Sequence, residues 1–236
     1  MKLDPAFIWT AFVQLLGALP TTLEITFVSV LCGFLIGTLV ALIRIFKVPV
    51  LEQLAAAYVS FIRGTPMLTH LLLIYFSLPL IIDGLAAHYG WNFHSASIPY
   101  IGFAYISFSI TASAYMAEII RSGLLAVDRG QIEAAYAVGM TTSQALRRIV
   151  FPQALAASLP HLSNSLIGML HGSTLAFTVS VVEINAKAQI VASTNWKFFD
   201  SYIAAALIFW GLTILIERIT AWIEQRINLY NRGGVA

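Results

Sequence analysis

The sequence predicts an all-α membrane protein with five transmembrane helices and a short cytoplasmic helix between the third and the fourth. Of the 236 residues, 59% are hydrophobic and 10% are charged, whereas soluble domains contain about 25% charged residues. The apolar residues collect in long segments, and the arginines collect in the stretches between alternate segments. We therefore treat residues 1–236 as a single transmembrane domain.

Five segments are apolar enough to cross a bilayer, which takes roughly 20 residues in a helix. They are residues 21–43, 65–83, 98–119, 152–171 and 199–223. Residues 172–198 are half apolar, which predicts broken helices packed inside the protein. Pro79 and Pro160 are expected to kink the second and fourth spans. Residues 1–20 are amphipathic, lack a signal-peptide cleavage pattern, and are expected to lie on the membrane surface.

The positions of lysine and arginine predict the orientation, because cytoplasmic loops are enriched in both. With the N-terminus outside, only Lys2, Lys187 and Lys197 of the 13 basic residues face outward. The inner side holds Arg44, Lys47, Arg63, Arg121, Arg129, Arg147, Arg148, Arg218, Arg226 and Arg232. This bias places residues 120–151 and the C-terminus in the cytoplasm.

Composition also disfavours several function classes. The net charge of +2, without a basic block, gives no reason to expect nucleic acid binding. The single cysteine, Cys32, has no internal disulfide partner, and the five histidines show no metal-ligand spacing. An intramembrane enzyme would need a nucleophile with a base, or paired acids, and the acids near the spans are scattered. We therefore predict no catalytic residue and no metal site.

Residues 120–151 predict a helix, a glycine turn and a second helix. Asp128 precedes a helical pattern that Gly139 is placed to end, and Thr142 or Ser143 is expected to cap the helix that leads to Pro152. Residues 133–135, Glu-Ala-Ala, are expected to begin the first helix, where the helix dipole favours the acid and the small side chains permit a close approach. The pattern alone fits both a docking helix and an ordinary solvated loop.

The stretch GQIEAAYAVGM…RRIVFPQAL resembles the E-A-A loop of permease subunits of binding-protein-dependent ABC importers. Phe151 stands where that family usually has leucine. The segments FIRGTPML (61–68), AYMAEIIRSGLLAVDRGQIEAA (114–135) and FPQALAASLPHLSN (151–164) resemble its polar amino-acid branch, and the similarity covers about residues 20–230. The residues that match the ATPase-coupling motif are Gly130, Gln131, Glu133, Ala134, Ala135, Gly139, Ile149 and Pro152.

The resemblance implies the type I ABC importer permease fold in the bacterial cytoplasmic membrane. It also implies two permease subunits, identical or homologous, two cytoplasmic ATPase subunits and an external solute-binding protein. This chain has no G-x-x-x-x-G-K-[ST] phosphate loop. We therefore expect ATP and Mg on the ATPase partner and no cofactor on this chain.

The substrate prediction depends on residues 171–184, HGSTLAFTVSVVEI, which resemble permeases for cystine and related sulfur amino acids. Histidine, arginine, glutamine and glutamate remain open. A secondary carrier is an alternative, although such carriers often show two related halves and no internal repeat is visible. A membrane scaffold would share the docking loop but would need no polar groups along the spans.

Two further groups of residues are singled out. Arg63, Gly64, Thr65 and Pro66 are expected to form a structural turn that leads from the cytoplasm into the second span, and Glu118 is expected to pair with Arg121 or with the next loop. Polar groups near membrane depth are costly and are therefore candidates for a substrate path; satisfying helix ends and one another is the alternative role. These candidates are Glu24, His70, Asn164, His171, Ser173, Thr174 and Glu183.

Overall fold

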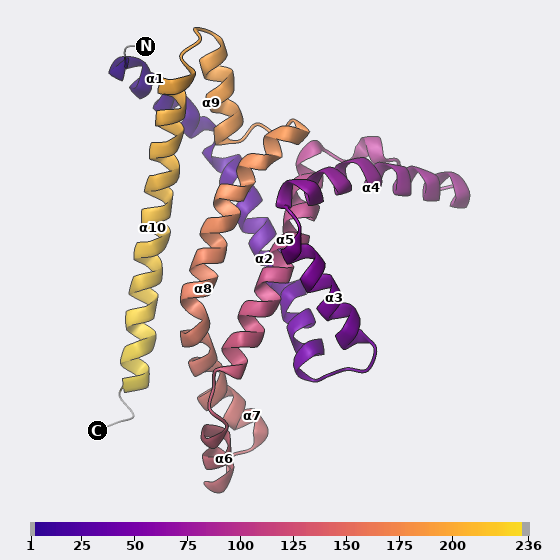
Figure 1. The fold of residues 1–236 in the computed structure, drawn as a ribbon, viewed down its shortest axis with the longest axis vertical. Coiled ribbons are helices and arrows are strands. Elements are labelled where there is room, and N and C mark those ends of the chain that lie inside the picture. The colour runs from indigo at the N-terminus through magenta and orange to yellow at the C-terminus, as the bar shows by residue number, and fades with distance from the viewer. Residues whose placement is uncertain (1–2, 233–236) are drawn as a thin grey trace.

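The computed structural model describes residues 3–232, and all regular elements among them are helices (Figure 1). The α-helices are α1 (Pro5–Leu15), α2 (Leu19–Ile45), α3 (Leu51–Gly64), α4 (Met67–Tyr89), α5 (Tyr100–Leu125), α6 (Arg129–Ala137), α7 (Thr142–Ala145), α8 (Phe151–Gly172), α9 (Ile184–Ser193) and α10 (Phe198–Arg232). Short 3-10 turns lie at Leu16–Ala18, Ser95–Ser97 and Ser173–Val179, and a π-helical turn lies at Leu146–Val150. Helices α6 and α7 form one extremity of the molecule, called here the loop end, whereas α1 and α9 lie at the other (Figure 1).

Four helical stretches within the described residues are long and apolar enough to cross a membrane: Pro5–Ile45, Met67–Tyr89, Tyr100–Leu125 and Phe198–Ile227. A fifth is the pair Thr142–Val179 and Ile184–Ser193, which is bent by 52° at its break. Counting this bent pair as one span gives the five spans that the sequence predicts, and the broken region follows α8 as expected. Pro79 and Pro160 lie inside α4 and α8, and both helices continue past them.

The N-terminal segment is continuous with the first span, which the sequence analysis did not expect. Helix α1 is capped by Asp4 and runs through a single 3-10 turn into α2, so no break separates it from the first span. Ala11 and Leu15 are fully buried against α9 and α10 in a cluster that includes Ile184 and Ala204. One side of α1 is therefore covered by protein, whereas Trp9 and Val13 are exposed.

Helices α2 and α5 form the central packing of the fold. Their contact depends on Gly33 and Gly37 of α2. A Cβ atom at Gly33 would lie 2.5 Å from the Cβ of Ala112, and one at Gly37 would lie 2.7 Å from the Cβ of Met116. Because neither glycine has a side chain, the two helices approach closely along their middle turns.

The turn at Arg63–Pro66 leads into the second span, α4, as expected, but it lies within the bundle and follows a helix that the sequence analysis did not predict. Residues 51–64, assigned to no element in advance, form α3, and the turn separates α3 from α4 beside the middle of α5. Thr65 and Pro66 are extended, and the guanidinium of Arg63 lies 5.6 Å from the ring centroid of Tyr115. The second span is thus preceded by its own helix, and Figure 1 shows α4 leaving the bundle as an arm.

Candidate functional site

The loop end carries α6, whose two termini are both fixed by local hydrogen bonds. Asp128 caps its start by accepting a hydrogen bond from the amide of Gly130 at 2.7 Å. At its end, Gly139 has a φ of +82°, and the amides of Gly139 and Met140 donate to the carbonyls of Tyr136 and Ala135, both at 3.0 Å. This is a Schellman ending, in which the glycine adopts a left-handed conformation that side chains disfavour. The predicted glycine turn is confirmed.

Two local predictions about this loop were wrong. Helix α6 begins at Arg129, so Glu133 is its fifth residue and lies beyond the first turn, where the helix dipole acts most strongly. The second helix is capped by Thr141, whose hydroxyl accepts from the amide of Gln144 while the Gln144 side chain accepts from the Thr141 amide. This reciprocal capping box excludes Thr142 and Ser143 from the capping position.

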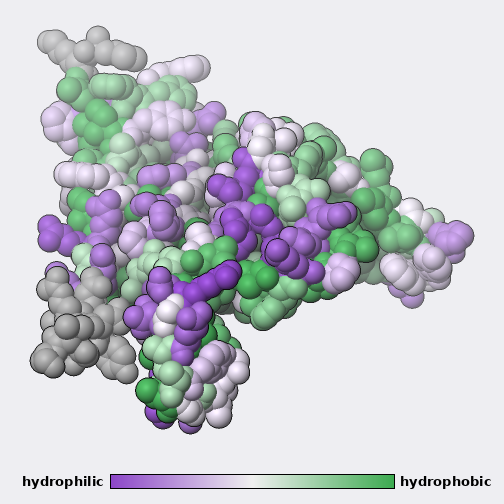
Figure 2. All heavy atoms as spheres, turned by 60° about the horizontal axis from the view of Figure 1, so that its bottom comes forward, coloured by the Kyte–Doolittle hydropathy of each residue, from purple (hydrophilic) through white to green (hydrophobic). Residues whose placement is uncertain are grey.

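The faces of α6 divide between the bundle and solvent. Ala135 is buried, whereas Glu133 and Ala134 are exposed, together with Tyr136 and Val138. Figure 2 shows the lobe of α6 and α7 standing out from this end of the molecule, with hydrophilic side chains gathered around its base. Of the two small residues in the motif, only Ala134 is thus available to another surface. The exposed tyrosine and valine were missed because an isolated apolar residue in a loop carries no signal of its own.

The loop packs against the ends of the spans. Val127, Val150 and Ala154 form a buried cluster against which Leu124 and Ile132 pack, linking the end of α5, α6 and the start of α8. Gly123 allows this junction to close, since a Cβ atom there would lie 1.8 Å from the hydroxyl of Ser158. Pro152 lies in the first turn of α8, as predicted. Movement of α6 would therefore be transmitted to α5 and α8.

A cluster of charged side chains lies where α2 and α5 meet near the loop end. Glu118 accepts from Nη2 of Arg121 at 2.8 Å, as the spacing predicted, and also pairs with the guanidinium of Arg44 at the end of α2. The Glu118 side chain is 19% exposed. Arg44 was missed because it lies 74 residues away in the sequence. The carboxylate therefore ties α2 to α5 near the loop end.

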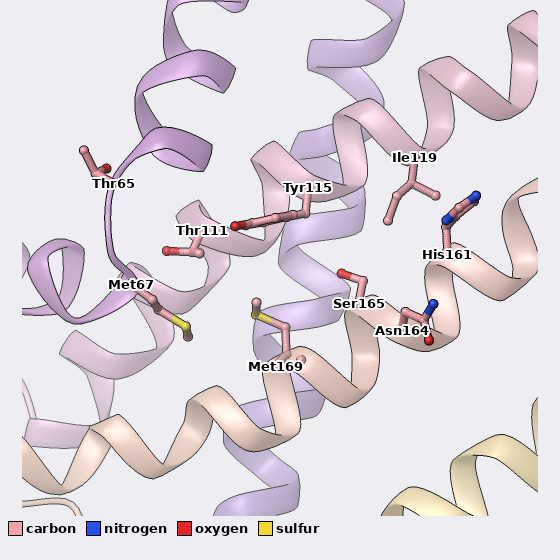
Figure 3. Close-up of a pocket in the computed structure, with 10 residues that line it drawn as sticks. Thr65, Met67, Thr111, Tyr115, Ile119, His161, Asn164, Ser165 and Met169 are labelled. Carbon is pink, nitrogen blue, oxygen red and sulfur yellow. The ribbon is translucent and has the colours of Figure 1, made fainter.

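A cavity of about 460 Å³ lies between the α3–α4 turn, α5 and α8 (Figure 3). Its lining residues are Thr65, Met67, Thr111, Tyr115, Ile119, His161, Asn164, Ser165, Gly168 and Met169. Hydroxyl, amide and imidazole groups thus share the wall with two thioethers. The buried hydroxyl of Ser165 has no hydrogen-bond partner among the described residues. An unpaired buried hydroxyl is costly, so this wall favours an occupant that can form hydrogen bonds.

Of the seven substrate-path candidates, only Asn164 lines the cavity. His70 lies behind the wall, where its Nε2 contacts the hydroxyl of Thr65 at 2.5 Å and its Nδ1 contacts that of Thr111 at 3.0 Å. Glu24 accepts a hydrogen bond of 2.5 Å from the hydroxyl of Tyr105. His70 thus holds the α3–α4 turn against α5, a role that its position in the sequence did not reveal.

The four remaining candidates lie around the broken helix that follows α8. His171 contacts the hydroxyl of Thr213 at 3.2 Å, and the hydroxyls of Ser173 and Thr174 donate to backbone carbonyls of the preceding turn. Glu183 is fully buried and caps α9, accepting from the amides of residues 185 and 186 at 2.7 Å each. These contacts match the alternative role, in which polar groups satisfy helix ends and one another.

The sequence analysis missed most of the cavity wall. On α8, the lining residues His161, Asn164, Ser165 and Gly168 follow a spacing of three, four and seven, which marks one face of a helix. This polar stripe could have been recognised in advance. Thr111 and Tyr115 of α5 could not, because only the packing of α5 against α8 turns that face toward the cavity.

A family model described as "Binding-protein-dependent transport system inner membrane component" matches residues 33–229. The chain belongs to this family. It is therefore the permease component of such a system and, with its apolar helices, a multi-pass inner-membrane protein. The family resemblance predicted from the E-A-A loop is confirmed.

The permease is similar to several amino-acid transport proteins over nearly its whole length. It is 42% identical to the "Probable amino-acid ABC transporter permease protein PatM" of Vibrio harveyi, covering 91% of this chain and 92% of that protein. It is 36% identical to the "L-cystine transport system permease protein TcyL" of Bacillus subtilis (strain 168), covering 92% and 89%. Among solved structures, the "Crystal structure of an amino acid ABC transporter with histidines" matches with a TM-score of 0.79 at 33% identity, covering 96% and 100%. The permease is thus a subunit of an amino-acid ABC importer with the type I importer fold.

Proposed function

We propose that the permease moves a polar amino acid, with cystine or a related sulfur amino acid favoured, and that α6 is the docking helix for a cytoplasmic ATPase. The observation that carries the docking proposal is the geometry of α6. Helix α6 is short and capped at both ends, exposes Glu133 and Ala134, and packs against the ends of the spans through Ile132. A helix of this kind can enter a cleft and carry movement of the cleft to α5 and α8.

The complete importer would contain two permease subunits, two ATPase subunits and an external solute-binding protein. The ATPases would bind ATP and Mg and carry out hydrolysis, while this chain would provide the path through the membrane. The charge bias supports an orientation with the N-terminus outside and α6 in the cytoplasm. ATP-driven closure of the ATPase pair would draw the two docked helices together and turn the path outward.

The docking proposal is tested by substituting a bulky residue on the exposed face of α6. Glu133→Trp should leave membrane insertion intact and lower the amount of ATPase that copurifies with the permease. Ser143→Trp, at an exposed position of α7, is the matched control and should not change this ratio. The docking role would be refuted by normal ATPase association and normal transport in Glu133→Trp.

The cystine proposal is supported by the pattern of residues 171–184 and by the similarity to the cystine permease. The same comparisons include nopaline and octopine permeases, and the solved neighbour is named with histidines. The test is uptake of labelled cystine by cells that express the permease with its ATPase and binding protein, in competition with unlabelled amino acids. Saturable uptake blocked only by sulfur analogues supports cystine. Uptake of histidine, arginine, glutamine or glutamate instead would exclude it.

The cavity beside the α3–α4 turn is the best candidate for a substrate contact within this chain. Asn164 and the unpaired hydroxyl of Ser165 offer polar contacts, and the thioethers of Met67 and Met169 offer apolar ones. Ser165→Ala removes a hydroxyl that has no partner in the fold, so it should preserve or slightly raise stability. It should also weaken substrate-stimulated transport. Unchanged transport kinetics in a stable Ser165→Ala permease would remove the cavity from the path.

A further inference from the structure

A second cavity, of about 390 Å³, opens between α2, α8 and α10 on the side of the bundle away from the α4 arm. Its wall is almost wholly apolar. The lining residues are Phe27, Val30, Leu31, Phe34, Met116, Leu159, Leu162, Ser163, Leu166, Ile216, Ile219, Thr220 and Ile223. The hydroxyl of Thr220 donates to that of Ser163 at 2.9 Å, so the two polar residues of the wall satisfy each other. This cavity is called the α2–α10 groove below.

The groove is lined by helices that cross the membrane, and its rim is exposed. Phe27 is 67% exposed, and Leu31 and Ile219 are 47% and 50% exposed. Hydrocarbon is the medium that surrounds such helices in a bilayer, and it leaves no polar group of this wall unsatisfied. An acyl chain therefore fits the groove better than a polar solute or water does.

The positively charged side chain of Arg226 follows the groove on α10, on the side toward the loop end. Arg226 follows Ile219 by seven residues and Ile223 by three, so it continues their side of α10 by one further turn. Its guanidinium lies 5.4 Å from the ring centroid of Trp222, and both side chains are exposed. Glu224 lies about 160° around the helix from Arg226 and does not face the same side. Tryptophan and arginine together are typical of the level where lipid headgroups begin.

We propose that the α2–α10 groove binds one acyl chain of an anionic phospholipid whose headgroup is held by Arg226 beside Trp222. The groove supplies the apolar contact, and the arginine supplies the preference for a negative headgroup. The site is separate from the cavity at the α3–α4 turn and does not depend on the identity of the transported solute. A helix of a second permease copy is the competing occupant.

The test uses the full-length permease, with any subunits that accompany it, in nanodiscs that contain equal amounts of phosphatidylglycerol and phosphatidylethanolamine. Native mass spectrometry after detergent extraction counts the lipids that remain bound. We expect retained phosphatidylglycerol to exceed phosphatidylethanolamine, and Arg226→Ala to lower its affinity about fivefold. Arg218→Ala removes the same charge two turns away, outside the groove, and should have no such effect.

A second pair of variants tests the acyl chain separately from the headgroup. Leu31→Trp places a bulky side chain at the rim of the groove and should lower retention of both phospholipids. Leu39→Trp, which is 63% exposed on α2 but outside the groove, is the control. Equal retention of the two lipids by the unmodified permease, or equal effects of Arg226→Ala and Arg218→Ala, would overturn the proposal. Cross-linking from Leu31 to a second permease copy, with no lipid retained, would assign the groove to a protein interface.

Discussion

The contact between α2 and α5 predicts that even one methyl group at Gly33 destabilises the permease. In Gly33→Ala the new Cβ would lie 2.5 Å from the Cβ of Ala112 and 3.0 Å from the amide nitrogen of Ser113. Nonbonded carbons prefer separations of about 3.5–4.0 Å, so the helices would have to move apart by roughly 1 Å. Overpacking of this kind costs about 1–3 kcal/mol.

The control has to remove the effect of helix propensity, because replacing a helical glycine by alanine stabilises a helix by about 0.5–1 kcal/mol. Gly211 lies inside α10, and a Cβ atom there would have nothing within 4 Å. Gly211→Ala gains the same propensity without the clash. Gly33→Ala should therefore be less stable than Gly211→Ala by about 1–3 kcal/mol, which is the overpacking cost alone.

The assay is thermal unfolding of the purified permease, followed by intrinsic tryptophan fluorescence. A change of 1 kcal/mol shifts the Tm of a chain of this length by about 2–4 °C, so the Tm of Gly33→Ala should lie about 2–12 °C below that of Gly211→Ala. Equal Tm values for the two variants would show that the α2–α5 contact tolerates a side chain, and the argument from close approach would fail.

Three further predictions concern the ends of the helices. Glu118→Gln weakens two charge-assisted contacts of a partly buried carboxylate, and denaturant unfolding should show a loss of about 2 kcal/mol. The hydrogen bond from Lys197 holds the pKa of Asp4 below its ordinary value of 3.8. This contact therefore stabilises α1 above that pH, and the stabilisation is lost as the pH falls through the lowered pKa. Hydrogen exchange in α1 should distinguish Asp4→Asn from the unmodified chain near neutral pH but not in strong acid. Thr141→Ala should increase hydrogen exchange in the first turn of α7, because it removes a cap worth about 1 kcal/mol, whereas Thr142→Ala should not. Equal hydrogen exchange in the two variants would contradict the capping box.

Several parts of the structure follow from local sequence. The E-A-A loop was predicted as a helix, a glycine turn and a helix because Asp128 and Gly139 act on backbone groups within a few residues of themselves. The residue that caps the second helix was not predicted correctly, because Thr141, Thr142 and Ser143 are equally suitable caps until the backbone conformation selects one. The pairing of Glu118 with Arg121 followed from helical spacing, whereas its pairing with Arg44 did not.

The sequence by itself determined the membrane class, the five spans and the family, because hydropathy and the E-A-A loop are properties of contiguous residues. The tertiary structure alone decided which polar groups face a cavity. Asn164 and Glu183 are both polar residues that the sequence analysis expected near membrane depth, yet Asn164 lines the cavity and Glu183 caps α9. The physical reason is that the partner of a polar group is set by how α3, α5 and α8 pack, through contacts between residues tens of positions apart. Periodicity within one helix places a residue on a face, but only the neighbouring helices determine what that face meets.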